Sequence, residues 1–255
     1  MKKHLKAGMI IYGTLLVVIA VVSGCATPAT PTSAPEVAPT TPPTAVPTAV
    51  PSTAPPADTP APELVGDPVR GGLMYDKWWV AAEVDAPTGD HPLWKAQTAN
   101  TRTGLDTWRC KECHGWDYKG VDGAYGSGSH LTGFPGLLDA ATMTTEELTA
   151  WLTGKNNPDH DFSAMMNEFE IAALVTFMQK EMVDTAAFIN ADKTVVGNPA
   201  RGRVKYENSC AACHGQDGKK LNFGDDAEPE FVGTIAVDNP WEFFHKTAFG
   251  HPAAA

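Results

Sequence analysis

The sequence of 255 residues predicts a mainly α-helical chain, in which two small tandem domains follow a disordered N-terminal tether. Three observations predict this organisation. A Cys-x-x-Cys-His motif occurs at 110–114 and again at 210–214, and the segment 68–76 returns in similar form at 199–207. Apolar residues recur at helical spacing, and no segment shows the alternation expected of a strand. The second domain lacks part of the pattern of the first, so we expect it to be incomplete.

The repeated motif indicates that two haem groups are covalently attached. In Cys-x-x-Cys-His the two thiols add to the haem vinyl groups, and the histidine binds the iron from the proximal side. A redox disulfide or a four-thiolate zinc site would use the cysteines but leave both histidines unexplained. The predicted attachment residues are Cys110, Cys113, Cys210 and Cys213, and the predicted proximal ligands are His114 and His214.

Residues 1–24 are typical of a signal peptide, because lysines precede a short apolar run. The run from 7 to 22 has 16 residues, fewer than the roughly 20 that span a bilayer. Ser23 and Gly24 before Cys25 resemble a bacterial lipobox, which implies cleavage before Cys25 and lipidation of its thiol. An uncleaved membrane anchor is the alternative. With either, we expect the body of the protein outside the cytoplasm and attached to the membrane.

The next segment, 25–63, is expected to be a disordered tether. It holds 12 of the 21 prolines of the chain, interleaved with Ala, Thr, Ser and Val. This composition cannot bury a core, so an extended chain is expected. The two domains are then predicted at 64–184 and 185–255.

The repeat also predicts an insertion in the first domain. Tyr75 and Tyr206 align at an offset of 131, and the second copy then runs directly into Cys210. In the first copy the motif begins 31 residues later than this alignment requires, so we predict an insertion at about 80–109. Its aromatic residues could pack on the haem or on the neighbouring domain, although a surface loop held by a few buried aromatics is the simpler expectation. These residues are His91, Trp94 and Trp108.

Two helices are predicted in the rest of the first domain. Thr144 and Glu147 form a capping-box pattern that opens one helix, and Asn167 with Glu170 opens another. In the second helix the apolar residues fall at positions i, i+3, i+4 and i+7 of one face. These are Ile171, Leu174, Val175 and Met178.

Residues 68–255 resemble a bacterial dihaem c-type cytochrome made of two class I cytochrome c domains. The stretch 206–218, which contains the second motif, is typical of that family. The resemblance implies electron transfer, and it implies that the helix after Asn167 closes the first domain by packing against the helix at 68–76.

The sixth ligand of the first iron is expected between the two predicted helices. Small cytochromes c usually carry a Met-Pro there, but this chain contains none, and His160 takes that place. Met165 and Met166 are the alternatives, with His130 and His91 behind them. The choice matters because a methionine ligand raises the reduction potential relative to bis-histidine ligation.

The second domain stops early in this alignment. The segment 243–250 aligns with 147–154 at an offset of 96, which places the counterpart of His160 one position beyond Ala255. The closing helix has no counterpart at all. We therefore expect the sequence to be incomplete at its C-terminus. The alternative is a natural end, with His245 or His251 as the ligand or with an open iron site.

The formal net charge of −11 and the pI of about 5.1 argue against nucleic acid as a partner and favour basic redox proteins. The expected function is electron transfer between extracytoplasmic partners. A thiosulfate dehydrogenase-like or peroxidase-like enzyme would need an open or unusual iron site, for which no cysteine is left. A haem sensor is the third possibility. No Gly-x-Ser-x-Gly, phosphate loop or His-Glu-x-x-His motif occurs, so no catalytic residue is assigned.

Overall fold

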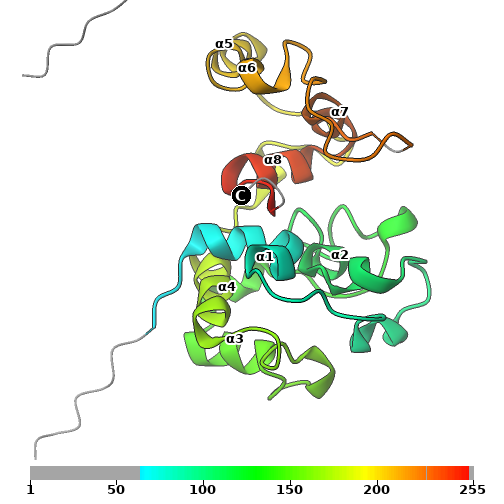
Figure 1. Cartoon of the computed structure of the whole chain (residues 1–255), viewed down its shortest axis with the longest axis vertical. Helices are drawn as coiled ribbons and strands as arrows, with labels where there is room; N and C mark the ends of the chain where they lie inside the picture. Colours follow the sequence, from blue (N-terminus) through cyan, green and yellow to red (C-terminus); the bar gives the residue numbers. More distant parts are fainter. Residues whose placement is uncertain (1–63, 228, 253–255) are drawn as a thin grey trace, which may run out of the picture. The chain divides into compact units, whose positions relative to one another are not determined.

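The computed structural model describes residues 64–227 and 229–252, which form eight α-helices and no β-sheet (Figure 1). The prediction of a mainly helical protein is therefore confirmed. The predicted signal peptide and tether, including Cys25, lie outside the described residues. The helices are α1 (Pro68–Ala81), α2 (Cys110–His114), α3 (Thr145–Leu152), α4 (Glu168–Lys180), α5 (Pro199–Ser209), α6 (Ala211–His214), α7 (Val232–Asp238) and α8 (Pro240–Phe249).

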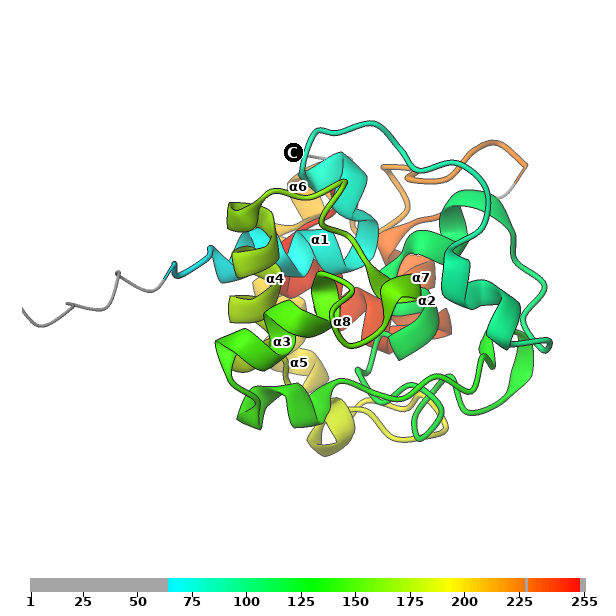
Figure 2. The ribbon, with the colours of Figure 1, turned by 90° about the horizontal axis from the view of Figure 1, so that it is seen from below.

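Helices α1 and α4 pack against each other (Figures 1 and 2). Asp67 caps α1 by accepting hydrogen bonds from the backbone N–H groups of Val69 and Arg70, and a proline follows at the first helical position. Gly71 allows the close approach, because a Cβ at this position would lie 2.1 Å from the carbonyl oxygen of Ala173. The predicted packing of the closing helix on the first helix is confirmed.

Both capping boxes predicted for the first domain are present. Thr144 accepts from the N–H of Glu147 at 3.2 Å, and the Glu147 carboxylate accepts from the N–H of Thr144 at 2.8 Å. Asn167 and Glu170 make the same reciprocal pair at the start of α4. The whole stretch from 170 to 178 is buried, because α4 packs on α1 and on α3. This burial includes the four apolar residues of the predicted face.

Helix α8 packs on the same first helix, α1, through the glycine that follows Gly71. A Cβ at Gly72 would lie 2.3 Å from the ring of Phe249. His245 is also buried there, and its Nε2–H donates to the carbonyl of Gly72 at 2.9 Å. Its Nδ1 accepts from the hydroxyl of Tyr118 at 2.6 Å. Two adjacent glycines therefore serve two different helix contacts.

The two motif regions share backbone geometry, which supports the alignment of the repeat. Tyr75 of α1 donates its hydroxyl to the carbonyl of Gly115 at 2.5 Å, and Tyr206 of α5 donates to Gly215 at 2.7 Å. Both glycines follow their motif and have positive φ angles, 76° and 83°, that favour glycine. The leading helix is therefore tied to the end of the motif in the same way in both copies.

The copies differ in what covers the leading helix. Helix α5 packs against α6 but buries none of its side chains, whereas α1 buries seven residues. A Cβ at Gly202, the counterpart of Gly71, would meet nothing within 4 Å. Within the described residues, α5 therefore has no equivalent of α4 on its glycine face.

This difference predicts opposite effects of one substitution at equivalent positions. Gly71→Ala should lower the free energy of unfolding by about 1–3 kcal/mol, because the new methyl group overlaps the backbone of α4. Gly202→Ala should be neutral or stabilise by up to about 1 kcal/mol, because alanine is the better helix former in open space. Urea unfolding followed by circular dichroism measures both. Equal losses in the two variants would contradict the packing described here.

Candidate functional site

A cavity of about 420 Å³ lies beside the first motif, within the roughly 300–1,000 Å³ that is usual for cofactor sites. The side chains of Cys110, Cys113 and His114 line it from α2. Helices α3 and α4 supply apolar walls, among them Leu148 and Leu174. The arrangement suits a large, flat, apolar group that is attached at the two thiols.

The predicted insertion forms another wall of this cavity. His91 and Trp108 both line it, together with Leu93. Trp94 does not, and it instead donates its indole N–H to the carbonyl of Arg102 at 2.8 Å. All three marked aromatic residues are buried, as expected of a loop held by buried aromatics, and two of them also line the cavity.

The motif cysteines of the first copy are half-buried thiols. Burial raises the pKa of Cys110 to about 12 and raises that of Cys113 still further. A redox-active Cys-x-x-Cys pair needs a thiol with a lowered pKa, so these two thiols suit structural attachment and not disulfide exchange. All four motif cysteines are free, and no three His, Cys, Asp or Glu side chains converge among the described residues. The two pairs therefore do not combine into one four-thiolate cluster.

His114 is held with one ring nitrogen directed at the protein. Its Nδ1–H donates to the carbonyl oxygen of Pro135 at 2.7 Å, so Nε2 carries the lone pair. Burial lowers the pKa of His114 to about 4, an effect to which nearby His160 adds and which the hydrogen bond to Pro135 opposes. The imidazole is therefore neutral at pH 7, which is the form that binds a metal ion.

His160 also lines the cavity, and its Nδ1, like that of His114, is directed at a backbone carbonyl. It ends the short 3₁₀ turn Pro158–His160, and its Nδ1–H donates to the carbonyl of Trp151 at 3.0 Å. Burial lowers its pKa as well. The rings of His114 and His160 are 6.4 Å apart and inclined by 85°.

Met166 is the other predicted ligand that reaches the cavity. It lines the wall and is 4 % exposed, whereas Met165 packs against the core and does not line the cavity. A thioether at Met166 therefore has access to the space between the helices. The ring of His160 lies edge-on to the ring of His114, with 6.4 Å between the two centroids.

The two remaining candidate histidines have no lone pair to offer. His130 uses both ring nitrogens, because Nδ1–H donates to Glu112 at 3.3 Å and Nε2 accepts from Arg102 at 3.3 Å. In His91 it is Nδ1 that accepts, from the N–H of Leu93 at 3.2 Å. The proton of neutral His91 therefore lies on Nε2, which cannot bind a metal in this tautomer.

The second motif has a different environment. The counterpart of Pro135 is Val232, which is the first residue of α7, and the buried Nδ1 of His214 has no hydrogen-bond partner within the described part of the chain. The ring of Phe223 lies 5.8 Å from His214 and 5.2 Å from His251. His245 uses both nitrogens in the contact with α1, so it is not available as a ligand. The surroundings of His214 are thus less organised than those of His114.

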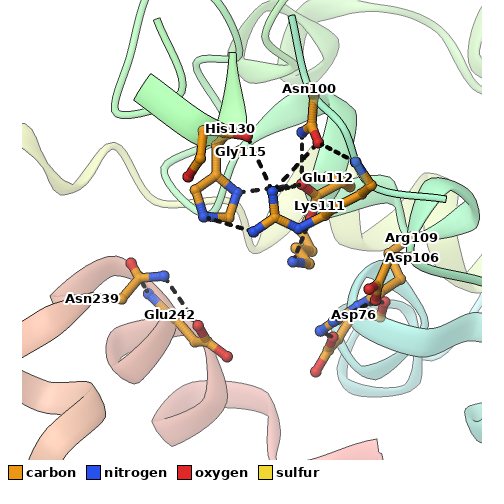
Figure 3. A network of polar contacts seen from close by, with 12 residues as sticks. Asp76, Asn100, Asp106, Arg109, Lys111, Glu112, Gly115, His130, Asn239 and Glu242 are labelled. Carbon is orange, nitrogen blue, oxygen red and sulfur yellow. Dashed lines mark hydrogen bonds and ion pairs between the residues drawn. The ribbon is translucent and has the colours of Figure 1, made fainter. Parts of the chain in front are cut away.

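Glu112, which precedes Cys113 in the first motif, belongs to a network of polar contacts (Figure 3). Glu112 is fully buried and accepts from Lys111 at 2.6 Å and from Asn100 at 3.0 Å, with Arg102 and His130 at 3.2 and 3.3 Å. Burial opposes ionisation, but these partners still hold the pKa of Glu112 well below its usual value. The sequence analysis missed this network, for which the only local signal was a charged pair inside the motif.

Comparison with protein-family models, with curated proteins and with solved structures yields no match for this chain. No helix in 64–227 or 229–252 is both long and apolar enough to cross a bilayer.

The buried network predicts a large stability loss when its carboxylate is neutralised. Glu112→Gln keeps the shape but leaves the buried ammonium of Lys111 without a counter-charge, so we expect a loss of about 3–5 kcal/mol. Asp184→Asn removes the partner of Lys119 from an exposed pair and should cause almost no loss. Urea unfolding measures both variants. A Glu112→Gln protein as stable as the control would show that Lys111 is not held by this charge.

Proposed function

We propose that this chain is a dihaem c-type cytochrome that carries electrons between redox partners outside the cytoplasm. The observation that carries the proposal is the pair of imidazoles at 114 and 160, which line one apolar cavity together with both motif cysteines and lie 6.4 Å apart. We further propose that lipid on Cys25 attaches the protein to the membrane. The acidic charge of −11 favours partners with a basic surface.

The residues of the first site divide the work of holding the cofactor. Cys110 and Cys113 would hold the cofactor through their thiols, and His114 and His160 would bind its metal. When bound, the haem supplies an iron that alternates between the ferric and ferrous states. The apolar side chains of α3 and α4 exclude water from this iron, and exclusion of water is one of the factors that set a reduction potential.

Bis-histidine ligation follows for the first iron, with His160 as the sixth ligand. Two backbone carbonyls, of Pro135 and Trp151, fix both Nδ1 atoms and so direct both Nε2 atoms away from the protein backbone. Such ligation gives a lower reduction potential than histidine–methionine ligation. For the second iron we propose His214 as the proximal ligand and assign no distal one.

The proposal predicts two covalent haems per chain. Full-length protein produced with a c-type maturation system should contain two haems by pyridine haemochrome assay and intact-protein mass spectrometry. Cys110→Ala with Cys113→Ala should leave one haem, and Cys210→Ala with Cys213→Ala should also leave one. A wild-type chain without covalent haem, or with a four-cysteine zinc ion, would contradict the proposal.

The ligand assignment predicts separate effects at two neighbouring positions. His160→Met should raise the reduction potential of one haem, because a thioether replaces an imidazole. Met166→Leu should leave both potentials and both ligand-field spectra unchanged, because leucine conserves the volume of this buried side chain.

Near-infrared magnetic circular dichroism and EPR at low temperature identify the axial ligands. A methionine charge-transfer band for the first haem of the wild-type protein would overturn the His160 assignment. A high-spin ferric haem that binds cyanide readily would instead favour the enzymatic alternative, a peroxidase-like or thiosulfate dehydrogenase-like activity.

A further inference from the structure

We propose that His91 donates a hydrogen bond from its Nε2–H to a propionate carboxylate of the first haem. The inference rests on the proposed function, since it concerns the cofactor of the same cavity. It gives the insertion a role in binding the cofactor that differs from covalent attachment by the motif and from metal binding by the axial ligands.

The tautomer of His91 follows from its backbone contacts. His91 precedes the 3₁₀ turn Pro92–Ala96, and its Nδ1 caps this turn by accepting from the N–H of Leu93 at 3.2 Å. Its own backbone N–H donates to the hydroxyl of Thr107 at 2.8 Å. With Nδ1 used as an acceptor, the ring proton of the neutral side chain must be on Nε2.

The position of the ring makes this proton a donor inside the cavity. His91 is 6 % exposed and lines the cavity, with its ring 4.6 Å from Trp108 and 6.0 Å from His160. Nε2 has no hydrogen-bond partner among the residues that the structure describes. A hydrogen-bond donor that has neither water nor another partner destabilises the folded protein. We therefore expect Nε2–H to have a partner once the cofactor fills the cavity.

The chemistry of the cofactor limits what that partner is. The edge of a haem carries hydrocarbon groups and two propionates, and only the propionates accept hydrogen bonds. With His114 and His160 as its axial ligands, the iron would carry no other ligand that could accept this hydrogen bond. The carboxylate of Asp159 acts electrostatically on His91, but it is already paired with the ammonium of Lys95 at 2.8 Å. The remaining acceptor is therefore a propionate.

The second copy provides a natural contrast. Its leading helix α5 ends at Ser209 and Cys210 follows directly, so the second site has no residue equivalent to His91. The second haem of the same molecule therefore serves as an internal control for every measurement on the first.

Two variants separate the capping role of His91 from its role in the cavity. His91→Asn keeps an acceptor for the N–H of Leu93, because asparagine is a favoured cap, but it is too short to place a donor at Nε2. His91→Gln places an amide N–H close to the position of Nε2 but caps poorly. Both are compared with wild type as full-length, haem-loaded protein, after the haem content of each has been measured.

The readouts are the reduction potential of each haem and the propionate bending band in resonance Raman spectra. His91→Asn should lower the potential of the first haem and shift the band, because the propionate charge loses its donor, while the melting temperature stays near wild type. His91→Gln should keep the potential and the band but lower the melting temperature. The second haem should not change in either variant.

The outcomes that overturn the inference are distinct from those that overturn the proposed function. A wild-type protein without covalent haem contradicts both. With two haems present, an unchanged potential and band in His91→Asn would show that His91 is a cap alone. The same conclusion follows if His91→Gln shifts the first haem as much as His91→Asn does.

Discussion

The carboxylate of Glu112, which precedes Cys113 in the first motif, is fully buried and stays ionised because four donors surround it. Asn100 and Arg102 come from the insertion, His130 comes from the loop after the motif, and Lys111 is its sequence neighbour. A buried charge with incomplete partners would cost several kcal/mol, so all of these segments must be in place together. The same segments bring the insertion against the motif, where it forms a wall of the cavity. The shape of the cavity thus depends on a charge that does not line it.

Which ring nitrogen carries the proton decides whether each histidine can bind a metal ion or donate a hydrogen bond into the cavity. His114 and His160 donate from Nδ1 to backbone carbonyls and keep a lone pair on Nε2, whereas His91 accepts on Nδ1 and keeps a proton on Nε2. The first two suit a metal ion and the third suits an anion. Burial lowers the pKa of all three, so the arrangement persists at neutral pH.

The two copies of the repeat have diverged where other elements contact them. In the first copy Gly71 faces α4 and Gly72 faces α8, whereas in the second Gly202 faces open space. Tyr118 has a positive φ of 60°, although its counterpart Gly218 shows that glycine suits this position better. The tyrosine is kept in this strained conformation because its hydroxyl binds His245 of α8. A contact with α8 therefore explains a residue that the local backbone disfavours.

The sequence by itself determined the helical class, the two capping boxes, the repeated positions of the leading segment, and the candidate ligands. These depend on local patterns, since a cap, an amphipathic face and a five-residue motif are each formed by neighbours in the chain. Only the tertiary structure decided that α8 packs on α1, that the insertion lines the cavity, and that Glu112 is buried. It also distinguished His160 from His91 and His130. The reason is that a hydrogen-bond partner distant in sequence, such as the carbonyl of Pro135 for His114, leaves no trace in the local pattern.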